Sequence, residues 1–465
     1  MVDGSWWFVA KHGGPVRGIH HPRSTIHHPA RALVASAAII AAALTLAAQT
    51  PRPDRARAVD AKNLRLIGHS DLNGKGNGGE GLDLEQYPDG RRILFYAHTA
   101  PPTCLTTIDV TDPARPRVLA QVPTVASHIR CNSLGVSGTT MVVAQNTDEP
   151  GQPHGGALVF DVSDPARPRQ IAAFDTSGGP SRGAHYVWFA DGRYAYLSTG
   201  APDFVPAVPP RGDDQFLMVV DVQNPRAPKE VGRWWMPGMR KGEPGAPLPR
   251  TKTRDGVRMH SAFVSPDRPN RLYAGWIDGG IVILDISDKT KPKLVGQRSW
   301  FPVTPGYIGH SFLPIFERGI AVVTQEANQE KCADWPKPIW TVDIRDEAHP
   351  KEITQFPYPA GLDEFCKAGR FGAHNIHMNR PKKTSAHLTQ TVVAAFQNAG
   401  VRVYSIADPA KPQEIGYFVP AAPPGVTGGG LINDVYVDEK GLIYAADRVG
   451  GGVYILAYNG PAPLR

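Results

Sequence analysis

The chain has little of what marks helical and nucleotide-binding enzymes. Helical periodicity is nearly absent, and neither a phosphate-binding loop nor a His-Glu-x-x-His helix occurs. The Gly-rich stretches at residues 74–81 and 428–430 follow no nucleotide fingerprint. Cysteine is also rare: the four cysteines form no Cys-x-x-Cys pair, so a zinc knuckle is not indicated. These absences exclude P-loop enzymes and helical zinc proteases.

Over most of the chain the positive and negative charges nearly balance. The formal net charge is +7, but residues 1–58 hold seven Lys and Arg against two acidic residues, so most of the excess lies there. The rest of the chain is nearly neutral. A nucleic-acid partner therefore has no electrostatic support, and we expect none.

Long hydrophobic runs are limited to one segment. A basic lead rich in His and Pro ends at Arg31, small and apolar residues fill positions 32–48, and a stretch rich in Pro and Arg follows. Such a run suits the core of a signal peptide and is short for a membrane span. We expect residues 1–58 to be an export signal with a polar linker, or a membrane anchor through residues 32–48. The protein would then be periplasmic or secreted in a bacterium, with no other contact to a membrane.

One pattern recurs through the rest of the chain. An apolar run ends in an acidic or small polar residue, a turn of the type Asp-Pro-x-x-Pro follows, and a second apolar run closes the unit, as in GALVFDVSDPARPRQIAAF at residues 156–174. The other copies are centred on Asp109, Asp221, Asp285, Asp343 and Ser405. Six copies at similar spacing predict a repeat architecture and not a set of separate domains.

Each copy predicts four strands. The run rich in Val and Ile pairs with the segment after the Pro turn, and a hairpin such as residues 185–198, with Asp191-Gly192 at its turn, precedes that pair. The final unit, from Asn433, stops one strand short, and residues 63–68 match the missing strand. We therefore predict an all-β fold, a seven-bladed β-propeller formed as a single domain by residues 59–465. Its last blade would be closed by an N-terminal strand.

The repeated apolar-Asp-x-Ser-Asp-Pro-x-x-Pro text resembles the LVIVD-repeat proteins, a family of bacterial and archaeal seven-bladed propellers. The resemblance extends from about Asn63 to the C-terminus. It implies the propeller fold and no particular activity, because most members of that family have no assigned function. The function must therefore be argued from a site.

Export changes the interpretation of the cysteines. In an oxidising compartment we expect two disulfides, Cys332 with Cys366 in the connections around the fifth and sixth blades, and Cys104 with Cys131 in adjacent blades. The alternative is four buried free thiols.

Aligning the blades on their first strands places a polar residue at the same position in each. Five blades have His there, and counting back from the hairpin turns gives Asp83 and Asn433 in the other two. First strands are innermost in a propeller, so these side chains should converge at one mouth of the central channel. The candidate ligands of a transition metal (Cu, Fe or Zn) are His128, His185, His260, His310, His374 and Asp83. The alternative is that the repeated His ties each inner strand to its neighbour.

The long connections gather on the face where these first strands begin, which is typical of a site on a rigid scaffold. They cover residues 146–155, 199–215, 236–258, 326–338, 357–372 and 420–430. Glu326, at the end of a second strand, is the candidate general base. Glu85 and Arg130, two residues beyond their aligned positions, should face the channel by strand alternation and are further catalytic candidates.

Together these features predict a metal-dependent enzyme, an oxidase or a hydrolase, that acts on a small molecule. The architecture is similar to that of selenium-binding proteins, which include methanethiol oxidases and hold copper near channel His residues. The His374-Asn375 strand opening resembles one of theirs. The competing hypothesis is a non-catalytic periplasmic or surface scaffold, in which the loop-rich face binds a protein or a glycan and the His residues are structural.

Overall fold

The structure is a computed structural model that describes residues 58–244, 256–300, 306 and 308–465. The chain divides into two units, residues 1–52 and 53–465, and all of the described strands belong to the second. The expected export segment at residues 1–58 lies outside the described residues, except for its last residue. Within the described part, no helix is long and apolar enough to cross a membrane.

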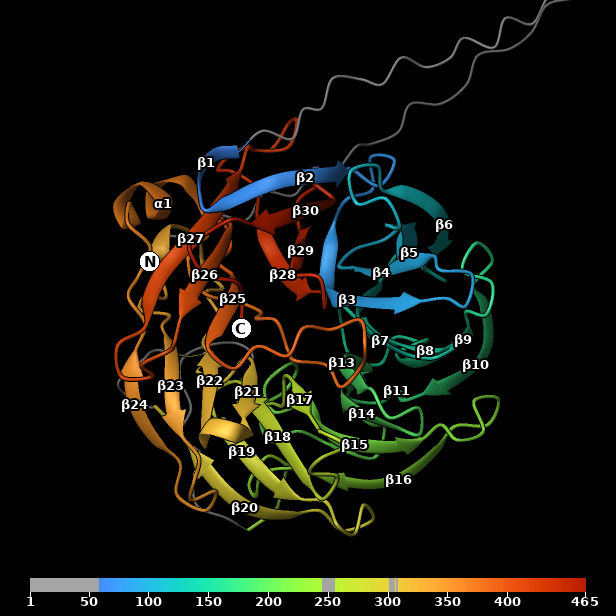
Figure 1. Cartoon of the computed structure of the whole chain (residues 1–465). Helices are drawn as coiled ribbons and strands as arrows, with labels where there is room; N and C mark the ends of the chain where they lie inside the picture. Colours follow the sequence, from blue (N-terminus) through green and yellow to red (C-terminus); the bar gives the residue numbers. More distant parts are fainter. Residues whose placement is uncertain (1–57, 245–255, 301–305, 307) are drawn as a thin grey trace, which may run out of the picture. The chain divides into compact units, whose positions relative to one another are not determined.

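The described strands form seven antiparallel blades in a ring, as predicted (Figure 1). Blade 1 is β3 (Gly78–Gln86), β4 (Arg92–His98), β5 (Thr103–Asp109) and β6 (Arg117–Pro123); blade 2 is β7 (Ile129–Ser137), β8 (Thr140–Thr147), β9 (Gly156–Asp161) and β10 (Arg169–Asp175). Blade 3 is β13 (Ala184–Phe189), β14 (Tyr194–Thr199), β15 (Phe216–Asp221) and β16 (Lys229–Trp234); blade 4 is β17 (Ala262–Phe263), β18 (Arg271–Trp276), β19 (Gly280–Asp285) and β20 (Lys293–Arg298).

The remaining blades follow the same order. Blade 5 is β21 (Phe312–Ile315), β22 (Ile320–Thr324), β23 (Ile339–Asp343) and β24 (Lys351–Gln355); blade 6 is β25 (Thr391–Ala395), β26 (Val401–Ser405), β27 (Gln413–Pro420) and β1 (Ala58–Lys62). Blade 7 is β28 (Ile432–Val437), β29 (Leu442–Asp447), β30 (Val453–Tyr458) and β2 (Leu64–Ser70). Short elements in the connections are β11 (Ser177–Gly178), β12 (Ser181–Arg182), the 3-10 helices η1 (Phe316–Arg318) and η2 (Glu330–Cys332), and α1 (Leu362–Ala368).

The recurring acidic residue of the repeat stabilises the turn that follows it. Asp221 Oδ1 accepts a hydrogen bond from the backbone N–H of Gln223 at 2.8 Å, and Asp285 Oδ1 accepts one from that of Ser287 at the same distance. These are Asx turns, in which a side-chain oxygen satisfies the backbone where the third strand ends. The apolar run before each acid is buried, as in Ile281–Leu284, because neighbouring blades pack on both faces of the sheet.

The ring is closed by the N-terminal strand, as the sequence predicts. β2 pairs antiparallel with β30, with Leu64 opposite Tyr458 and Ser70 opposite Val453. The strand before it was not predicted: β1 pairs with β27 as the outer strand of blade 6, with Lys62 opposite Tyr417. The N-terminal segment therefore lies across the junction between blades 6 and 7.

Both predicted disulfides are present. Cys104 on β5 is bonded to Cys131 on β7, beside the His98–Cys131 backbone pair that joins the sheets of blades 1 and 2. Cys332 in η2 is bonded to Cys366 in α1, so the second disulfide joins two of the long connections. Two disulfides fit an extracellular or periplasmic protein.

One long connection lies on the opposite face from the others. Residues 378–390, here called the cross-channel segment, join the inner edge of blade 6 to β25 and cross the middle of the ring in Figure 1. Lys382 Nζ donates hydrogen bonds to Asp83 Oδ1 (2.8 Å) and Glu85 Oε1 (2.6 Å) of blade 1 and to Val136 O of blade 2. The guanidinium of Arg380 lies 4.9 Å from the centre of the Trp188 ring of blade 3. The segment is thus fixed to three other blades and covers the centre on that side.

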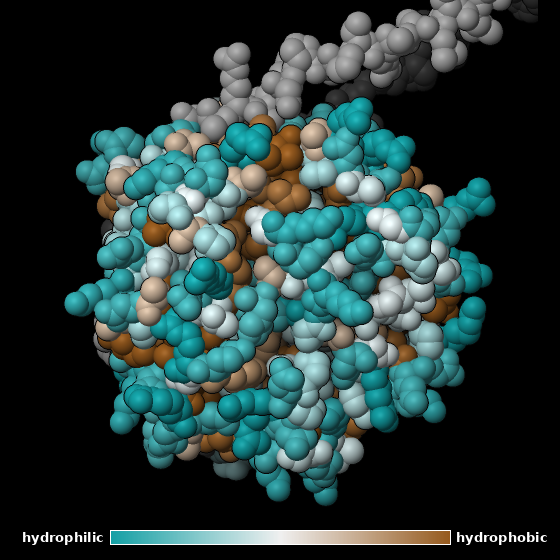
Figure 2. Space-filling model, viewed as in Figure 1, coloured by the Kyte–Doolittle hydropathy of each residue, from teal (hydrophilic) through white to brown (hydrophobic). Residues whose placement is uncertain are grey.

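The face shown in Figure 2 is mostly hydrophilic, and its apolar residues lie mainly between the blades. Exposed large apolar side chains in the described residues are few: Val125, Val205, Val208 and Leu294. They form no broad apolar surface for a partner.

Candidate metal centre

Four of the aligned His residues meet on the axis of the ring. They come from blades 3 to 6 in order, and their ring centres are 4.9, 3.8 and 4.4 Å apart from one blade to the next. All four are buried, and they are His185, His260, His310 and His374. Two buried carboxylates join them, Glu80 of blade 1 and Glu326 at the end of β22. We call these six residues the His/Glu cluster.

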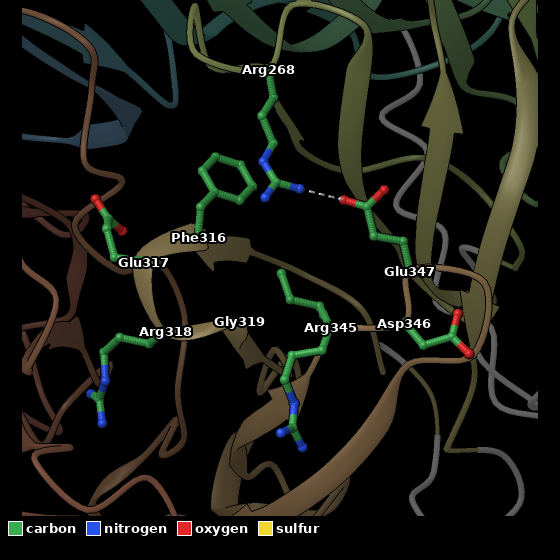
Figure 3. A pocket seen from close by; sticks show the side chains of 9 residues that line it. Arg268, Phe316, Glu317, Arg318, Gly319, Arg345, Asp346 and Glu347 are labelled. Atoms are coloured by element: carbon green, nitrogen blue, oxygen red, sulfur yellow. Dashed lines mark hydrogen bonds and ion pairs between the residues drawn. The ribbon is translucent and has the colours of Figure 1, made fainter.

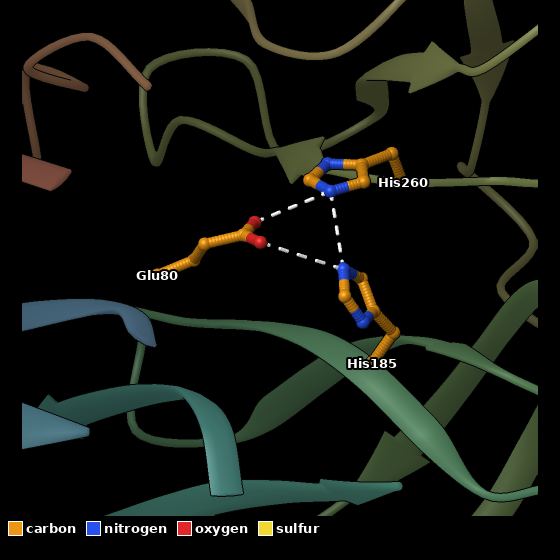
Figure 4. A group of neighbouring side chains, drawn as sticks. All are labelled: Glu80, His185 and His260. Atoms are coloured by element: carbon orange, nitrogen blue, oxygen red, sulfur yellow. Dashed lines mark hydrogen bonds and ion pairs between the residues drawn. The ribbon is translucent and has the colours of Figure 1, made fainter. Parts of the chain in front are cut away.

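Glu80 holds one side of the cluster (Figure 4). Its Oε2 lies 3.2 Å from His260 Nε2 and 3.8 Å from His310 Nε2, and its Oε1 lies 3.6 Å from His185 Nε2. The Nε2 atoms of His185 and His260 are 3.2 Å apart. Asn132 Nδ2 of blade 2 donates to Glu80 Oε1 at 2.9 Å, which fixes the carboxylate from behind. His374 Nε2 lies 4.0 Å from Glu80 Oε1, so one carboxylate reaches the imidazoles of four blades.

Glu326 holds the other side. Its Oε1 is 3.5 Å from His374 Nε2, and its Oε2 is 3.8 Å from His310 Nε2. Arg370 Nη2 donates to Glu326 Oε1 at 2.8 Å. On the far side of His374, its Nδ1 lies 2.5 Å from the carbonyl oxygen of Asn433. A carbonyl oxygen can only accept a hydrogen bond, so Nδ1 donates and the orientation of the ring is fixed. This leaves Nε2 of His374 as the nitrogen available to a ligand.

Burial sets the protonation of the cluster. Burial lowers the pKa of His185 to about 3, although Glu80 opposes the shift. Burial, with His260 and His374 beside it, lowers the pKa of His310 well below its usual range. Burial alone would raise the pKa of Glu80, but His260 and His185 hold it well below its ordinary value. His185 and His310 are thus neutral and Glu80 is ionised at pH 7, the forms that coordinate metal ions.

Several atoms of the cluster have no hydrogen-bond partner. They are His260 Nδ1, His310 Nε2, His374 Nε2 and Glu80 Oε2, all of them buried. The Nε2 atoms of His310 and His374 face the Glu80 carboxylate at 3.8 and 4.0 Å. A buried polar atom without a partner costs about 1–3 kcal/mol. In one set of three possible metal ligands, Glu80, His310 and His374, the ligand atoms lie within 4.8 Å of one another. Three buried atoms without partners in such a set fit a bound cation. Imidazole and carboxylate without thiolate suit a first-row transition metal or zinc.

The other predicted site residues lie elsewhere. His128 precedes β7, and its Nε2 is 3.3 Å from the carbonyl oxygen of Pro153, outside the His/Glu cluster. Asp83 and Glu85 face Lys382 of the cross-channel segment. Arg130 lies at the loop-side mouth, with its Nε 3.9 Å from Asp148 Oδ1. Of these, His128 and Arg130 lie on the side of the long connections, since both contact residues of the connection 146–155.

Glu80 is the residue that the sequence comparison missed, and a β-bulge explains why. The pairing of β3 with β4 shifts register between Gly78 and Leu82, so counting back from the hairpin turn arrives at Asp83 instead of Glu80. A Cβ at Gly79 would lie 2.4 Å from the carbonyl oxygen of Asn132, so the strand approaches blade 2 too closely for a side chain there. The glycines around Glu80 were the available signal, since glycine inside a strand often marks a bulge.

A larger hollow lies away from the cluster. It has a volume of about 650 Å³ and lies between turns of blades 4 and 5, where Arg268 covers Phe316 and pairs with Glu347 at 3.1 Å (Figure 3). It is lined by no His or Cys, and Glu317, Arg345 and Asp346 pair with residues outside it. On the axis, a cavity of about 20 Å³ adjoins Glu80 and has room for about one water molecule. The chemistry-bearing groups therefore lie on the axis and not in the larger hollow.

The family model of the LVIVD repeat matches residues 212–235 and 270–298, in blades 3 and 4. The chain therefore contains LVIVD repeats within a β-propeller, as the sequence pattern indicates. No curated protein sequence matches the chain.

Among solved structures the chain is similar to other β-propellers. Raptor of Chaetomium thermophilum is 12% identical, with a TM-score of 0.49, over 87% of this chain and only 30% of that one. The Cps50 (Swd1) propeller domain of Myceliophteria thermophila is 14% identical, with a TM-score of 0.49, over 86% and 99% of the two chains. The periplasmic gluconolactonase PpgL of Pseudomonas aeruginosa is 15% identical, with a TM-score of 0.48, over 87% and 99%. At these identities the likeness concerns the fold alone.

Proposed function

We propose that this LVIVD-repeat propeller is an exported, metal-dependent enzyme, an oxidase or a hydrolase, that acts on a small molecule on its axis. The observation that carries the proposal is the meeting of four imidazoles and two carboxylates in one buried place, with three unpartnered atoms in one set of possible ligands. A purely structural His ring would be expected to satisfy those atoms within the protein.

The ligands of the metal would come from the His/Glu cluster. His185, His260 and Glu80 lie closest together, while His310, His374 and Glu326 complete the other side. Glu326 was expected to be a general base, but its contacts with two imidazoles and with Arg370 favour a ligand role. Asn132 and Asn433 would keep the ligands oriented from outside, as hydrogen-bonding neighbours of metal ligands do.

A metal at this place would supply Lewis-acid or redox chemistry, and the donor set of nitrogen and oxygen suits Cu, Fe or Zn. The protein would supply a dry, rigid surrounding in which electrostatic interactions are stronger than in water. The cross-channel segment closes one side, so the small molecule would enter from the side of the long connections. The two disulfides support export, and a signal peptide within residues 1–58 would direct it.

The test is metal content measured by inductively coupled plasma mass spectrometry on the exported protein, purified without a His tag or chelator. We expect about one transition-metal ion per chain in the wild type and background content in the double variant His260→Ala/His310→Ala. The control is His349→Ala/His387→Ala, which removes two exposed imidazoles and should keep the metal. Background content in the wild type, including after reconstitution with Cu, Fe and Zn, would refute the proposal.

The identity of the metal determines which activity should be assayed. A redox-active metal leads to measurement of oxygen consumption with small reduced substrates, and zinc leads to hydrolysis of chromogenic esters and lactones. Activity that follows metal content across the same variants would establish the enzyme. Metal without any such activity would leave the alternative of a binding scaffold.

A further inference from the structure

Six arginines gather around the axis on the side of the long connections. They belong to five blades, and most are wholly or largely buried. They are Arg130, Arg182, Arg211, Arg258, Arg370 and Arg448. We call them the arginine layer. Burying several guanidinium groups near one another is unfavourable unless negative charge compensates them.

The arginine layer is joined directly to the His/Glu cluster. Arg370 pairs with Glu326 at 2.8 Å, as described above. Arg448 Nη1 donates to Asn433 Oδ1 at 3.0 Å, and the carbonyl oxygen of the same Asn433 holds the ring of His374. Both arginines therefore lie one hydrogen-bonded residue away from a candidate ligand.

Two more members lie next in the chain to residues of the channel. Arg258 precedes the cluster residue His260 by two positions, and its Nη1 donates to Gln215 Oε1. Arg130 precedes Asn132 by two positions, and Asn132 donates to Glu80 of the cluster. Along the axis from the long connections inward, the arginine layer comes before the His/Glu cluster. A molecule that enters from the loops meets the arginines first.

Two arginines have little compensation. Arg182 Nε pairs with Asp214 at 2.6 Å, and Arg370 with Glu326, but no carboxylate of the described residues lies within 4.0 Å of Arg448. Arg130 has only the long contact with Asp148, whose side chain is 58% exposed, while the Nε of Arg130 is itself buried without a partner. Burial, together with the charges of Arg448 and Arg182, lowers the pKa of Arg130 to about 10. Arg130 and Arg448 thus carry positive charge close to the axis with little compensation from the described carboxylates.

We infer that the arginine layer binds an oxyanion, so that the small molecule of this site carries a carboxylate, phosphate or sulfate group held by Arg130 and Arg448. Guanidinium is the side chain suited to these planar or tetrahedral oxyanions, because it donates two parallel hydrogen bonds in a fixed geometry. The assignment of substrate class rests on the proposed function; anion binding by the layer does not. The layer holds the anionic end of the molecule, and the rest of it extends inward to the His/Glu cluster.

The experiment is isothermal titration calorimetry of the full protein with inorganic phosphate, sulfate and acetate as separate probes, before and after treatment with a chelator. The variants are Arg130→Gln, whose side chain is partly exposed and bonded to little, and Arg130→Gln/Arg448→Gln. The control is Arg115→Gln/Arg167→Gln, which removes two strongly exposed guanidinium groups from turns. Metal content is measured on every sample.

We expect at least one of the three anions to bind the wild type. Its affinity should fall at least tenfold in the double variant, less in Arg130→Gln, and not at all in the control, with metal content unchanged throughout. The anion that binds most tightly shows whether the small molecule carries a carboxylate or a tetrahedral oxyanion. No binding of any probe at 10 mM, or equal affinity in wild type and double variant, would overturn the inference and leave the metal centre standing. Arginine-dependent binding to a protein without metal would retain the inference and remove the proposed function.

Discussion

Lys382 is the residue on which the closure of one side of the axis depends. Its Nζ is bonded to two carboxylates, and the exposed fractions are 11% for Lys382, 0% for Asp83 and 17% for Glu85. The change Lys382→Met keeps the apolar stem and removes the only ammonium that faces both acids. Removing one partner of a buried ion pair typically costs 3–5 kcal/mol, because the other charge stays buried without compensation.

The structure places the expected loss at the lower end of that range. Asp83 retains hydrogen bonds from the backbone N–H groups of Leu84 (2.9 Å) and Val136 (2.8 Å), and Arg380 Nη1 remains 3.7 Å away. We therefore expect Lys382→Met to lower the free energy of unfolding by about 3 kcal/mol at pH 7. The measurement is urea unfolding followed by tryptophan fluorescence. The control is Lys411→Met, which removes an exposed ammonium on a turn.

The loss of stability in Lys382→Met should also depend on pH, in a direction that follows from the pKa of Glu85. Burial raises the pKa of Glu85, and Lys382 opposes the shift, so its removal should raise that pKa further. A carboxyl group whose pKa is higher in the folded than in the unfolded protein contributes stability below the unfolded pKa and loses it as the pH rises through the folded one. Lys382→Met should therefore approach the wild type near pH 4 and differ most at neutral pH. Adding Glu85→Gln should recover part of the loss. A loss under about 1 kcal/mol, or one independent of pH, would refute the reasoning.

Three further predictions concern the rest of the ring. Cys104→Ala/Cys131→Ala opens a loop of 27 residues and should lower the free energy of unfolding by about 3.5 kcal/mol, measured by urea unfolding against the wild type with and without reductant. Deleting residues 58–70 removes β1 and β2, exposes the edges of two blades and should convert the peak of the folded protein in size-exclusion chromatography into aggregates. Burial raises the pKa of Asp434 to about 7, so Asp434→Asn should gain stability relative to the wild type as the pH rises from 4 to 8, by about 1.4 kcal/mol per unit of pKa shift. A constant difference across that range would contradict the third.

The fold was predictable because six of the seven blades repeat the same short sequence pattern. The Val- and Ile-rich run, the Asx turn and the Pro each act within a few residues, so their pattern survives in the sequence. The closing strand β2 could be found for the same reason, since residues 63–68 read like the return strand of another blade. β1 could not, because nothing in Ala58–Lys62 repeats and its pairing with β27 depends on where β2 leads the chain.

The candidate site was predictable where the inner segments are regular and not where they bulge. His185, His260, His310 and His374 lie together as the alignment of blades predicts, while their role as ligands stays a prediction. In blade 2 the pairing of β7 with β8 shifts register between Arg130 and Ser133, so Asn132 and not His128 faces Glu80. Such shifts are set by the contact between blades, which a comparison of single repeats does not contain.

The cross-channel segment was missed for a different reason. It is a hairpin connection, and hairpin connections are short in the other blades, so its length was an isolated departure from the repeat. Its anchors, Lys382 and Arg380, look like ordinary surface cations until the acids of blade 1 are placed opposite them.

The seam between β2 and β30 fixes the order in which the molecule can be completed. β2 is synthesised before strands β3 to β27 and its partner β30 after them, so blade 7 cannot form until blades 1 to 6 have left the ribosome or crossed a membrane. Until then the nascent protein is an open arc whose unpaired strand edges are able to pair with other chains. The closure that protects the finished ring thus prolongs the interval in which the unfinished one needs a chaperone.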